Sequence, residues 1–224
     1  SCTLCAPQDP DCVETAVVKQ CQSGECVSSL SGECRSGQRM ALVGDSITVG
    51  WDSSYKAALA AKLGGAVTLE NLGVNSSTAK SYQSTSAYGT LLSRHWNVSV
   101  LMFGTNEILS GMSNESEFVH EYVKLISSVA ADEILLMVPP QSRGSRPRMD
   151  ALVPLVESIA ASLGLAAPIN LIPVVTEFMD DLHPSAAGNA QIASAVHARL
   201  QCSSDASDAS DSTLIAIGTV LVVV

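Results

Sequence analysis

The strongest indication of the fold is a buried strand that ends in a sharp turn, in the stretch Met40-Ala41-Leu42-Val43-Gly44-Asp45-Ser46-Ile47-Thr48-Val49-Gly50. Its four leading apolar residues predict a short buried strand, and Gly44, Asp45 and Ser46 predict a sharp turn out of that strand. A serine held at such a turn can be presented as a nucleophile. The plainer interpretation is that Asp45 or Ser46 only caps a following helix.

Further apolar runs repeat this strand pattern along residues 39–202. They are continuous rather than alternating, which is typical of strands buried on both faces. Strands are predicted at 39–44, 66–72, 98–103, 133–138 and 166–172, and helices at 55–63, 87–96, 115–130, 149–163 and 185–200. The repeated order predicts an α/β fold with a parallel sheet covered by helices on both sides. An active site is then expected at the carboxyl ends of the strands, where Ser46 falls.

The composition excludes some classes of protein. The chain has 224 residues, is 46% hydrophobic and carries a formal net charge of −10. This is apolar enough for a large core, and the lack of a basic run argues against a nucleic-acid partner. The three close arginines Arg143, Arg146 and Arg148 are interpreted as solvated loop charges, with contact to an acidic substrate as the alternative.

Six of the seven cysteines lie in the first 34 residues, at Cys2, Cys5, Cys12, Cys21, Cys26 and Cys34. This density predicts that residues 1–38 form a disulfide-stapled segment in an oxidising compartment. The Cys2-x-x-Cys5 spacing also suits zinc, but no second pair and no nearby histidine completes such a site. The disulfide pairing and the partner of Cys202 stay open.

The other end of the chain predicts a surface location. Residues 203–212 form an acidic small-residue linker, and residues 214–224 are almost wholly apolar. This pattern matches a GPI-anchor signal, while a membrane helix cut short and a core strand are the alternatives. Asn-x-Ser sequons at Asn75, Asn97 and Asn114 suit a secreted glycoprotein, with Asn114 the best acceptor. We therefore expect a secreted or surface protein, with membrane attachment through residues 203–224 if the tail is an anchor.

Two loops follow predicted strands and carry polar donors. The first is Asn71-Leu72-Gly73-Val74-Asn75-Ser76-Ser77-Thr78, and the second is Gly104-Thr105-Asn106-Glu107. A tetrahedral intermediate carries a negative oxygen, and backbone N–H groups or an Asn amide can stabilise it. Alone, each loop would be an ordinary turn.

The fourth block, Asp180-Asp181-Leu182-His183-Pro184, precedes the last predicted helix. His183 can act as a base, and Asp180, three residues earlier, can reach its imidazole and fix the tautomer. Serine, carboxylate and histidine are the minimum set for acyl transfer.

The four blocks together resemble the SGNH hydrolases, also called the GDSL esterase/lipase family, over about residues 39–201. The matching motifs are Gly44–Ile47 for Gly-Asp-Ser-(Leu or Ile), Gly104–Glu107 for Gly-x-Asn-(Asp or Glu), and Asp180–Pro184 for Asp-x-x-His-Pro. The resemblance implies a three-layer α/β/α fold of flavodoxin-like type. It also implies Ser46 as nucleophile, His183 as base, Asp180 orienting the histidine, and Ser46, Ser76 and Asn106 forming the oxyanion hole.

Ser76 departs from the family pattern. The second family block is usually Asn-x-x-x-x-Gly, and counting from Asn71 the glycine position falls on Ser76. A backbone N–H remains available from serine, but Ser76 would need a conformation that glycine adopts at lower cost. The expected consequence is a less efficient oxyanion hole, not a missing one.

We therefore expect a serine esterase that needs no metal and no cofactor and removes a short acyl group, acetyl in the first place, from a carbohydrate. The chain lacks both Gly-x-Ser-x-Gly and His-Glu-x-x-His. The alternatives are a surface binding or adhesion module on a hydrolase fold, and a lipase or thioesterase of the same family. The oligomeric state is not readable from the sequence.

Overall fold

The structure is a computed structural model that describes residues 37–50, 54–65, 67–112, 114–141 and 149–200. It also describes the backbone of two short strands, Cys21–Gln22 (β1) and Glu25–Cys26 (β2), which pair antiparallel. The predictions for the rest of the cysteine-rich segment, for the arginines at 143–148 and for residues 201–224 lie outside the described residues.

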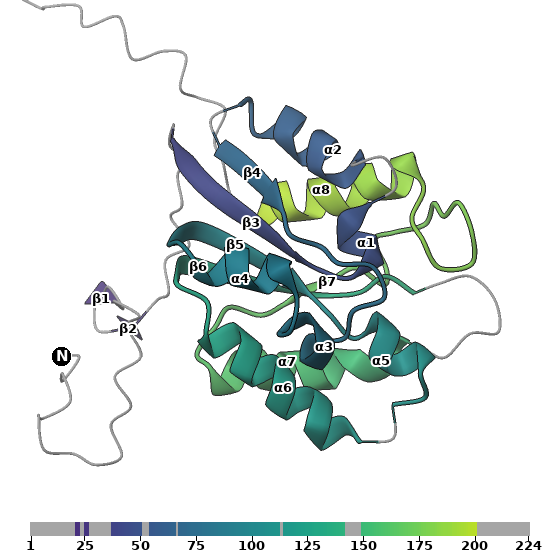
Figure 1. Cartoon of the computed structure of the whole chain (residues 1–224). Coiled ribbons are helices and arrows are strands. Elements are labelled where there is room, and N and C mark those ends of the chain that lie inside the picture. Colours follow the sequence, from purple (N-terminus) through teal and green to yellow (C-terminus); the bar gives the residue numbers. More distant parts are fainter. Residues whose placement is uncertain are drawn as a thin grey trace, which may run out of the picture.

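The centre of the fold is a five-stranded sheet with the order β4-β3-β5-β6-β7 (Figure 1). Its strands are β3 (Gln38–Gly44), β4 (Val67–Asn71), β5 (Trp96–Met102), β6 (Ala131–Val138) and β7 (Ile169–Asn170). Every neighbouring pair is parallel, which confirms the predicted parallel sheet. In chain order this is the 2-1-3-4-5 arrangement of flavodoxin-like sheets. The loops that follow β3, β4 and β5 therefore share one edge.

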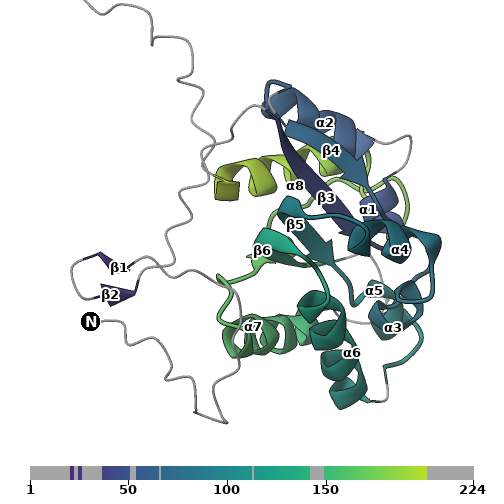
Figure 2. The same ribbon diagram turned by 60° about the vertical axis from the view of Figure 1, so that its left-hand side comes forward.

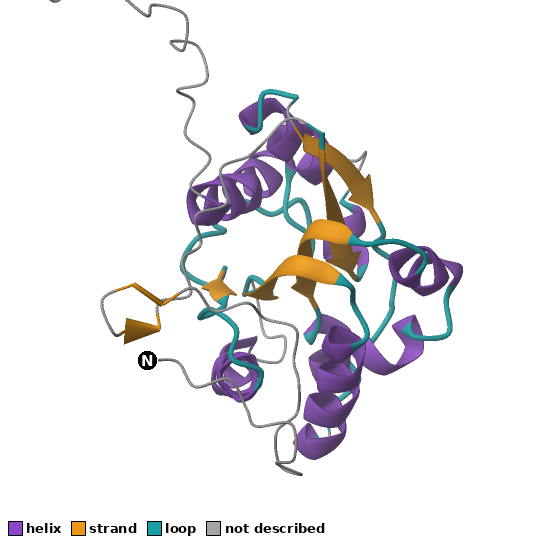
Figure 3. Ribbon diagram, turned by 90° about the vertical axis from the view of Figure 1, so that its left-hand side faces the viewer, coloured by secondary structure: helices purple, strands orange, loops and turns teal. Residues whose placement is uncertain are grey.

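Helices cover both faces of this sheet (Figures 2 and 3). They are α1 (Ser46–Val49), α2 (Ser54–Lys62), α3 (Ala79–Tyr82), α4 (Ser86–Leu92), α5 (Thr105–Leu109), α6 (Glu115–Ser127), α7 (Leu152–Ser162) and α8 (Ala186–Leu200), with a 3-10 turn η2 at Met149–Ala151. On one face Leu59 of α2 and Ile192 of α8 share a core with Leu42 of β3. On the other face Tyr122 of α6 and Val156 of α7 share a second core with β3 and β5 residues. No helix in the described ranges is long and apolar enough to cross a bilayer.

The prediction of one helix over residues 87–96 is wrong at its end. Helix α4 ends at Leu92, and β5 already begins at Trp96. The hydroxyl of Ser93 donates to the Thr90 carbonyl at 2.8 Å, which helps to end the helix. The Trp96 side chain is buried, and its indole N–H donates to the Leu91 carbonyl at 2.9 Å. Trp96 therefore anchors the start of the strand against the end of the helix.

The strand predicted at 166–172 is also shorter than expected. Strand β7 has only the two residues Ile169–Asn170, which pair with Met137 and Val138 at the sheet edge. Pro168 directly precedes it and has no N–H to donate, so pairing cannot extend regularly in that direction.

Candidate active site

Ser46 is the first residue of α1 and follows the end of β3 directly. Asp45 caps this helix, because its Oδ1 accepts the Ile47 N–H at 2.9 Å. Gly44 allows the close passage of the chain here, since a Cβ at this position would lie 2.5 Å from the Met102 carbonyl oxygen. The turn therefore leaves Ser46 partly exposed at the carboxyl end of the sheet while Asp45 and Ile47 are buried.

A continuous line of hydrogen bonds joins Ser46, His183 and Asp180. Ser46 Oγ lies 3.0 Å from His183 Nε2, and His183 Nδ1 lies 2.8 Å from Asp180 Oδ2. The second oxygen of Asp180 accepts the backbone N–H groups of Leu182 and His183, both at 2.6 Å. The loop thus fixes the carboxylate that in turn fixes the imidazole.

The electrostatics of Asp180 favour its ionised form. Desolvation raises the pKa of this carboxyl, but the hydrogen bonds from the His183 backbone and imidazole and from the Leu182 N–H outweigh it and lower the pKa to about 2. A carboxylate that stays charged at neutral pH can stabilise an imidazolium at His183.

Ser76 lies in the loop between β4 and α3, and its backbone has φ +58°. Among the described residues it is the only one other than glycine with a positive φ. This is the left-handed conformation that glycine, the usual residue of the family motif at this position, adopts at lower cost. The loop is held against the serine turn by the Val74 N–H, which donates to the Gly44 carbonyl at 2.9 Å.

Asn106 is the second residue of α5, the short helix that follows β5 after Phe103 and Gly104. Its Nδ2 donates to the Ser77 carbonyl at 2.8 Å and lies 3.5 Å from Asp45 Oδ2. The side chain thus connects the loop that carries Ser76 with the turn that carries Ser46.

These residues meet in a cleft of about 440 Å³. It is lined by Ser46, Ile47, Val49, Gly50, Asn75, Ser76, Asn106, Leu182, His183, Pro184 and Asn189. Four of the five predicted site residues line the cleft, and Asp180 contacts it through His183. The structure therefore brings all five together at the expected edge of the sheet.

Two residues of this region had no predicted role. Asn71 donates from Nδ2 to the carbonyls of Thr48 and Val49 at 2.8 and 3.1 Å, which ties the end of α1 to β4. Asn189 is 1% exposed, and its Nδ2 donates to Ser54 Oγ at 2.6 Å. Asn71 opens the second predicted block and Asn189 lies just after the last one, but nothing in the sequence pattern assigns either residue a partner.

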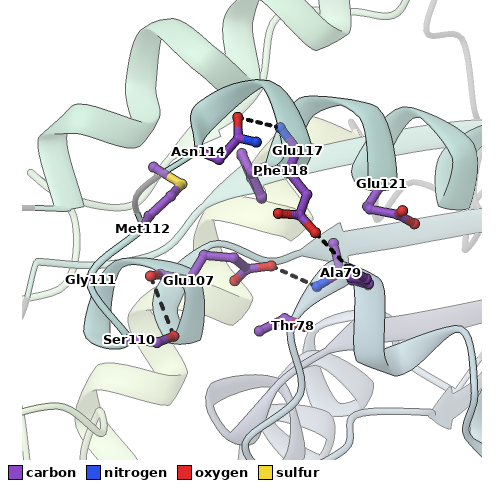
Figure 4. A pocket seen from close by; sticks show the side chains of 11 residues that line it. Thr78, Ala79, Glu107, Ser110, Gly111, Met112, Asn114, Glu117, Phe118 and Glu121 are labelled. Carbon is purple, nitrogen blue, oxygen red and sulfur yellow. Dashed lines mark hydrogen bonds and ion pairs between the residues drawn. The ribbon is translucent and has the colours of Figure 1, made fainter.

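Glu107 is the third such residue, and it bridges the two donor loops. Its Oε1 accepts the Ala79 N–H at 2.6 Å, and its Oε2 accepts the Gly104 N–H at 3.1 Å. Burial raises the pKa of this carboxyl, and the same backbone hydrogen bonds oppose the shift. Glu107 also borders a second cavity of about 240 Å³, where Figure 4 shows it pointing toward Ala79. This cavity is lined by residues of α3, α5 and α6, and none of the five predicted site residues lines it.

In the described ranges, no three histidine, cysteine, aspartate or glutamate side chains form a group that could hold a metal ion.

A sequence model of the GDSL-like lipase/acylhydrolase family matches residues 42–191, which include all five site residues. No curated protein matches the chain. Among solved structures, it is similar to a carbohydrate acetylesterase from Sinorhizobium meliloti, with 17% identity, a TM-score of 0.63, and coverage of 73% of this chain and 98% of that chain. A catalytic mutant of an acetylxylan esterase from Geobacillus stearothermophilus gives 19% identity and a TM-score of 0.62, covering 76% of this chain and 97% of that one. An aryl esterase from M. smegmatis gives 16% identity and a TM-score of 0.60, covering 73% and 98%. At these identities the likeness shows a shared fold.

Proposed function

The chain belongs to the GDSL-like lipase/acylhydrolase family and is a carboxylic ester hydrolase, and we propose that it removes a short acyl group, acetyl in the first place, from a carbohydrate. The reaction proceeds through a covalent acyl-enzyme on Ser46. The observation that carries this proposal is the hydrogen-bonded line from Ser46 Oγ through His183 to Asp180, with distances of 3.0 and 2.8 Å.

In the first half of the reaction, Ser46 Oγ attacks the ester carbonyl carbon while His183 Nε2 takes the hydroxyl proton. Asp180 accepts the Nδ1–H and stabilises the imidazolium. The tetrahedral intermediate then collapses, the bond from carbon to the alcohol oxygen breaks, and His183 returns its proton to the leaving alcohol. In the second half, His183 activates a water molecule that releases the acid and regenerates the Ser46 hydroxyl.

The negative oxygen of each intermediate needs donors that are in place before it forms. We assign this role to the backbone N–H groups of Ser46 and Ser76 and to Nδ2 of Asn106. Support comes from the position of all three residues on the lining of one cleft.

The proposed substrate class rests on the lining of the cleft. Its polar side chains include Asn75, Ser76 and Asn106, which suit the hydroxyl groups of a sugar. The apolar lining consists of the short side chains of Ile47, Val49, Leu182 and Pro184, and no Phe, Tyr or Trp lines the described cleft. Two of the similar structures are named as a carbohydrate acetylesterase and an acetylxylan esterase, which points in the same direction.

The proposed location is the outside of the cell, with residues 203–224 serving as a lipid-anchor signal. The cysteine count and the tail composition support this proposal. Expression of the full chain in eukaryotic cells tests it. Release of surface activity by a phosphatidylinositol-specific phospholipase C is expected, and activity that stays with the cells after this treatment contradicts the anchor.

Hydrolysis of p-nitrophenyl esters from acetate to palmitate tests the proposed reaction. Wild type should be fastest on the shortest chains, and Ser46→Ala should lose activity by at least about 10⁴-fold while remaining folded. Ser194→Ala is the matched control, because Ser194 is exposed in the middle of α8 and donates only to the Ala190 carbonyl. An optimum at long chains would identify a lipase instead. Acetylated xylo-oligosaccharides then test the carbohydrate part.

A further inference from the structure

Asp45 is a buried carboxylate that the proposed reaction does not use. It directly precedes Ser46 and is 0% exposed. Removal of a carboxylate from water is costly, and burial raises the pKa of Asp45 to about 6 even though the Ile47 N–H and the Thr105 hydroxyl act against the shift. Because burial of this carboxylate beside Ser46 costs free energy, we expect its contacts to contribute to the function of the site.

The two oxygens of Asp45 face different segments of the site. Oδ1 accepts the Ile47 N–H at 2.9 Å and so holds the turn that carries the Ser46 backbone N–H. Oδ2 lies 3.5 Å from Asn106 Nδ2. One carboxylate therefore contacts the segments that supply two of the three proposed oxyanion donors.

The distances at Asn106 indicate that Asp45 orients its amide without forming a full hydrogen bond to it. One N–H of its amide is committed to the Ser77 carbonyl at 2.8 Å. The 3.5 Å separation from Asp45 is at the outer limit of a hydrogen bond, so the carboxylate attracts the amide without saturating it. The second N–H, which Asp45 Oδ2 attracts only weakly, is therefore the one that can donate to a developing oxyanion.

We propose that Asp45 is a positioning residue for ester hydrolysis, whose two carboxylate oxygens hold the Ser46 turn and the Asn106 amide in one preorganised arrangement. This inference rests on the proposed function. It assigns a role to a side chain that makes no contact with the reacting atoms.

An asparagine at this position separates the two contacts. A carboxylate offers two acceptor oxygens, whereas an Asn amide offers one oxygen and one NH₂ group. Asn is as good a helix cap as Asp, so Asp45→Asn should keep the contact to Ile47 and turn its NH₂ toward the NH₂ of Asn106. The variant therefore removes the orientation of Asn106 and leaves the serine turn in place.

The ionised form of Asp45 is the one that attracts the amide. Glu107, His183 and Tyr122 are the titratable groups that interact with it, and Glu107 and His183 have opposite effects on its charge. Activity should therefore fall as Asp45 is protonated at a pH near its pKa of about 6. This contribution to the acid limb of log kcat/KM should be absent in Asp45→Asn.

A double-mutant cycle on kcat for p-nitrophenyl acetate tests the inference. Asn106→Ala should lower kcat by about 10²–10³-fold through loss of an oxyanion donor. Asp45→Asn should lower kcat by about 10–10²-fold, with KM changed less than about 3-fold. The double variant should fall no more than about 3-fold below Asn106→Ala, because residues that act as one unit are not additive. Asp132→Asn, which alters an exposed carboxylate, should match wild type.

Multiplicative losses in the double variant, or wild-type kcat and an unchanged acid limb in Asp45→Asn, would overturn the inference. Asp45→Ser serves the same cycle if Asp45→Asn does not fold, because serine also keeps one cap acceptor and lacks the second oxygen. Failure here is distinct from failure of the proposed function. Multiplicative losses of kcat in an enzyme that Ser46→Ala inactivates refute only the role of Asp45, whereas full activity in Ser46→Ala refutes the serine mechanism.

Discussion

Ser76 holds a backbone conformation that costs a non-glycine residue free energy. At φ +58° its Cβ is crowded, and glycine would relieve this. Ser76→Gly should therefore raise the free energy of unfolding by about 0.5–1 kcal/mol, measured by chemical denaturation. The kcat should stay close to wild type, because the backbone N–H is retained.

Ser84→Gly is the matched control for this substitution. Ser84 is exposed in a turn and does not have a positive φ, so glycine there only adds freedom to the unfolded chain and should lower stability. A loss of stability in Ser76→Gly similar to that in Ser84→Gly would show that Ser76 is not strained.

Asp45 and Asp180 should give opposite dependences of stability on pH. The pKa of Asp45 is raised from 3.8 to about 6, so the folded state holds a proton that the unfolded state has lost, and stability falls as the pH rises through this window. The pKa of Asp180 is lowered from 3.8 to about 2, so its contribution is present above about 4 and is lost as the pH falls through about 2.

Thermal melts of wild type and Asp45→Asn at pH 4 and pH 8 check the sign for Asp45. The melting temperature of the variant relative to wild type should be higher at pH 8 than at pH 4, because only wild type has a buried carboxyl at position 45 that ionises in that interval. The same difference at both pH values would contradict the raised pKa.

At the scale of elements, the start of α8 is packed closely against the segment that leads to His183. A Cβ at Gly188 would collide with the Glu177 carbonyl oxygen and lie 2.9 Å from Pro184 Cβ. Gly188→Ala should therefore lower the free energy of unfolding by about 1–3 kcal/mol and also lower kcat, because the loop before α8 has to shift. Denaturation and ester hydrolysis measure the two effects.

Gly89→Ala in α4 is the matched control. No atom lies within 4 Å of a Cβ built there, and alanine favours a helix interior by about 0.5–1 kcal/mol over glycine. Equal effects of the two substitutions would mean that the close approach at Gly188 does not constrain the fold.

The elements differ in how well the sequence predicts them. Continuous apolar runs place all five parallel strands, because such runs can only be buried on both faces. The helices α1, α3 and α5 span 4, 4 and 5 residues, which is too short for a helical period to be visible. Their starts depend on local caps such as Thr78, whose hydroxyl accepts the Ser81 N–H at 3.0 Å.

The site residues also differ in how well the sequence predicts them. Motif spacing predicts Ser46, Asp180 and His183, and hydrogen bonds join Ser46 to His183 and His183 to Asp180 in the structure. Motif spacing does not identify the partners of Asp45 and Glu107, although both stand inside the predicted blocks. Their contacts join segments that are 61 and 28 residues apart in the chain, such as Glu107 to the Ala79 N–H. Only the folded sheet brings these segments together.

For the whole molecule, the described part supplies its own core. The buried apolar residues on both faces of the sheet lie between Met40 and Leu200. A chain trimmed to residues 37–202 should therefore fold cooperatively and keep kcat on p-nitrophenyl acetate within about 3-fold of the full chain. A trimmed chain that gives no cooperative melt would show that the fold depends on residues outside this range.

The central claim is that Ser46 becomes covalently acylated, and labelling with a fluorophosphonate followed by peptide mass spectrometry tests it most directly. We expect one adduct per chain, located on Ser46, with activity lost in proportion to labelling. Ser46→Ala should take up no adduct, and Ser194→Ala should label as wild type does. Complete inactivation with the adduct on another residue, or an active wild-type enzyme that never labels at Ser46, would refute Ser46 as the nucleophile.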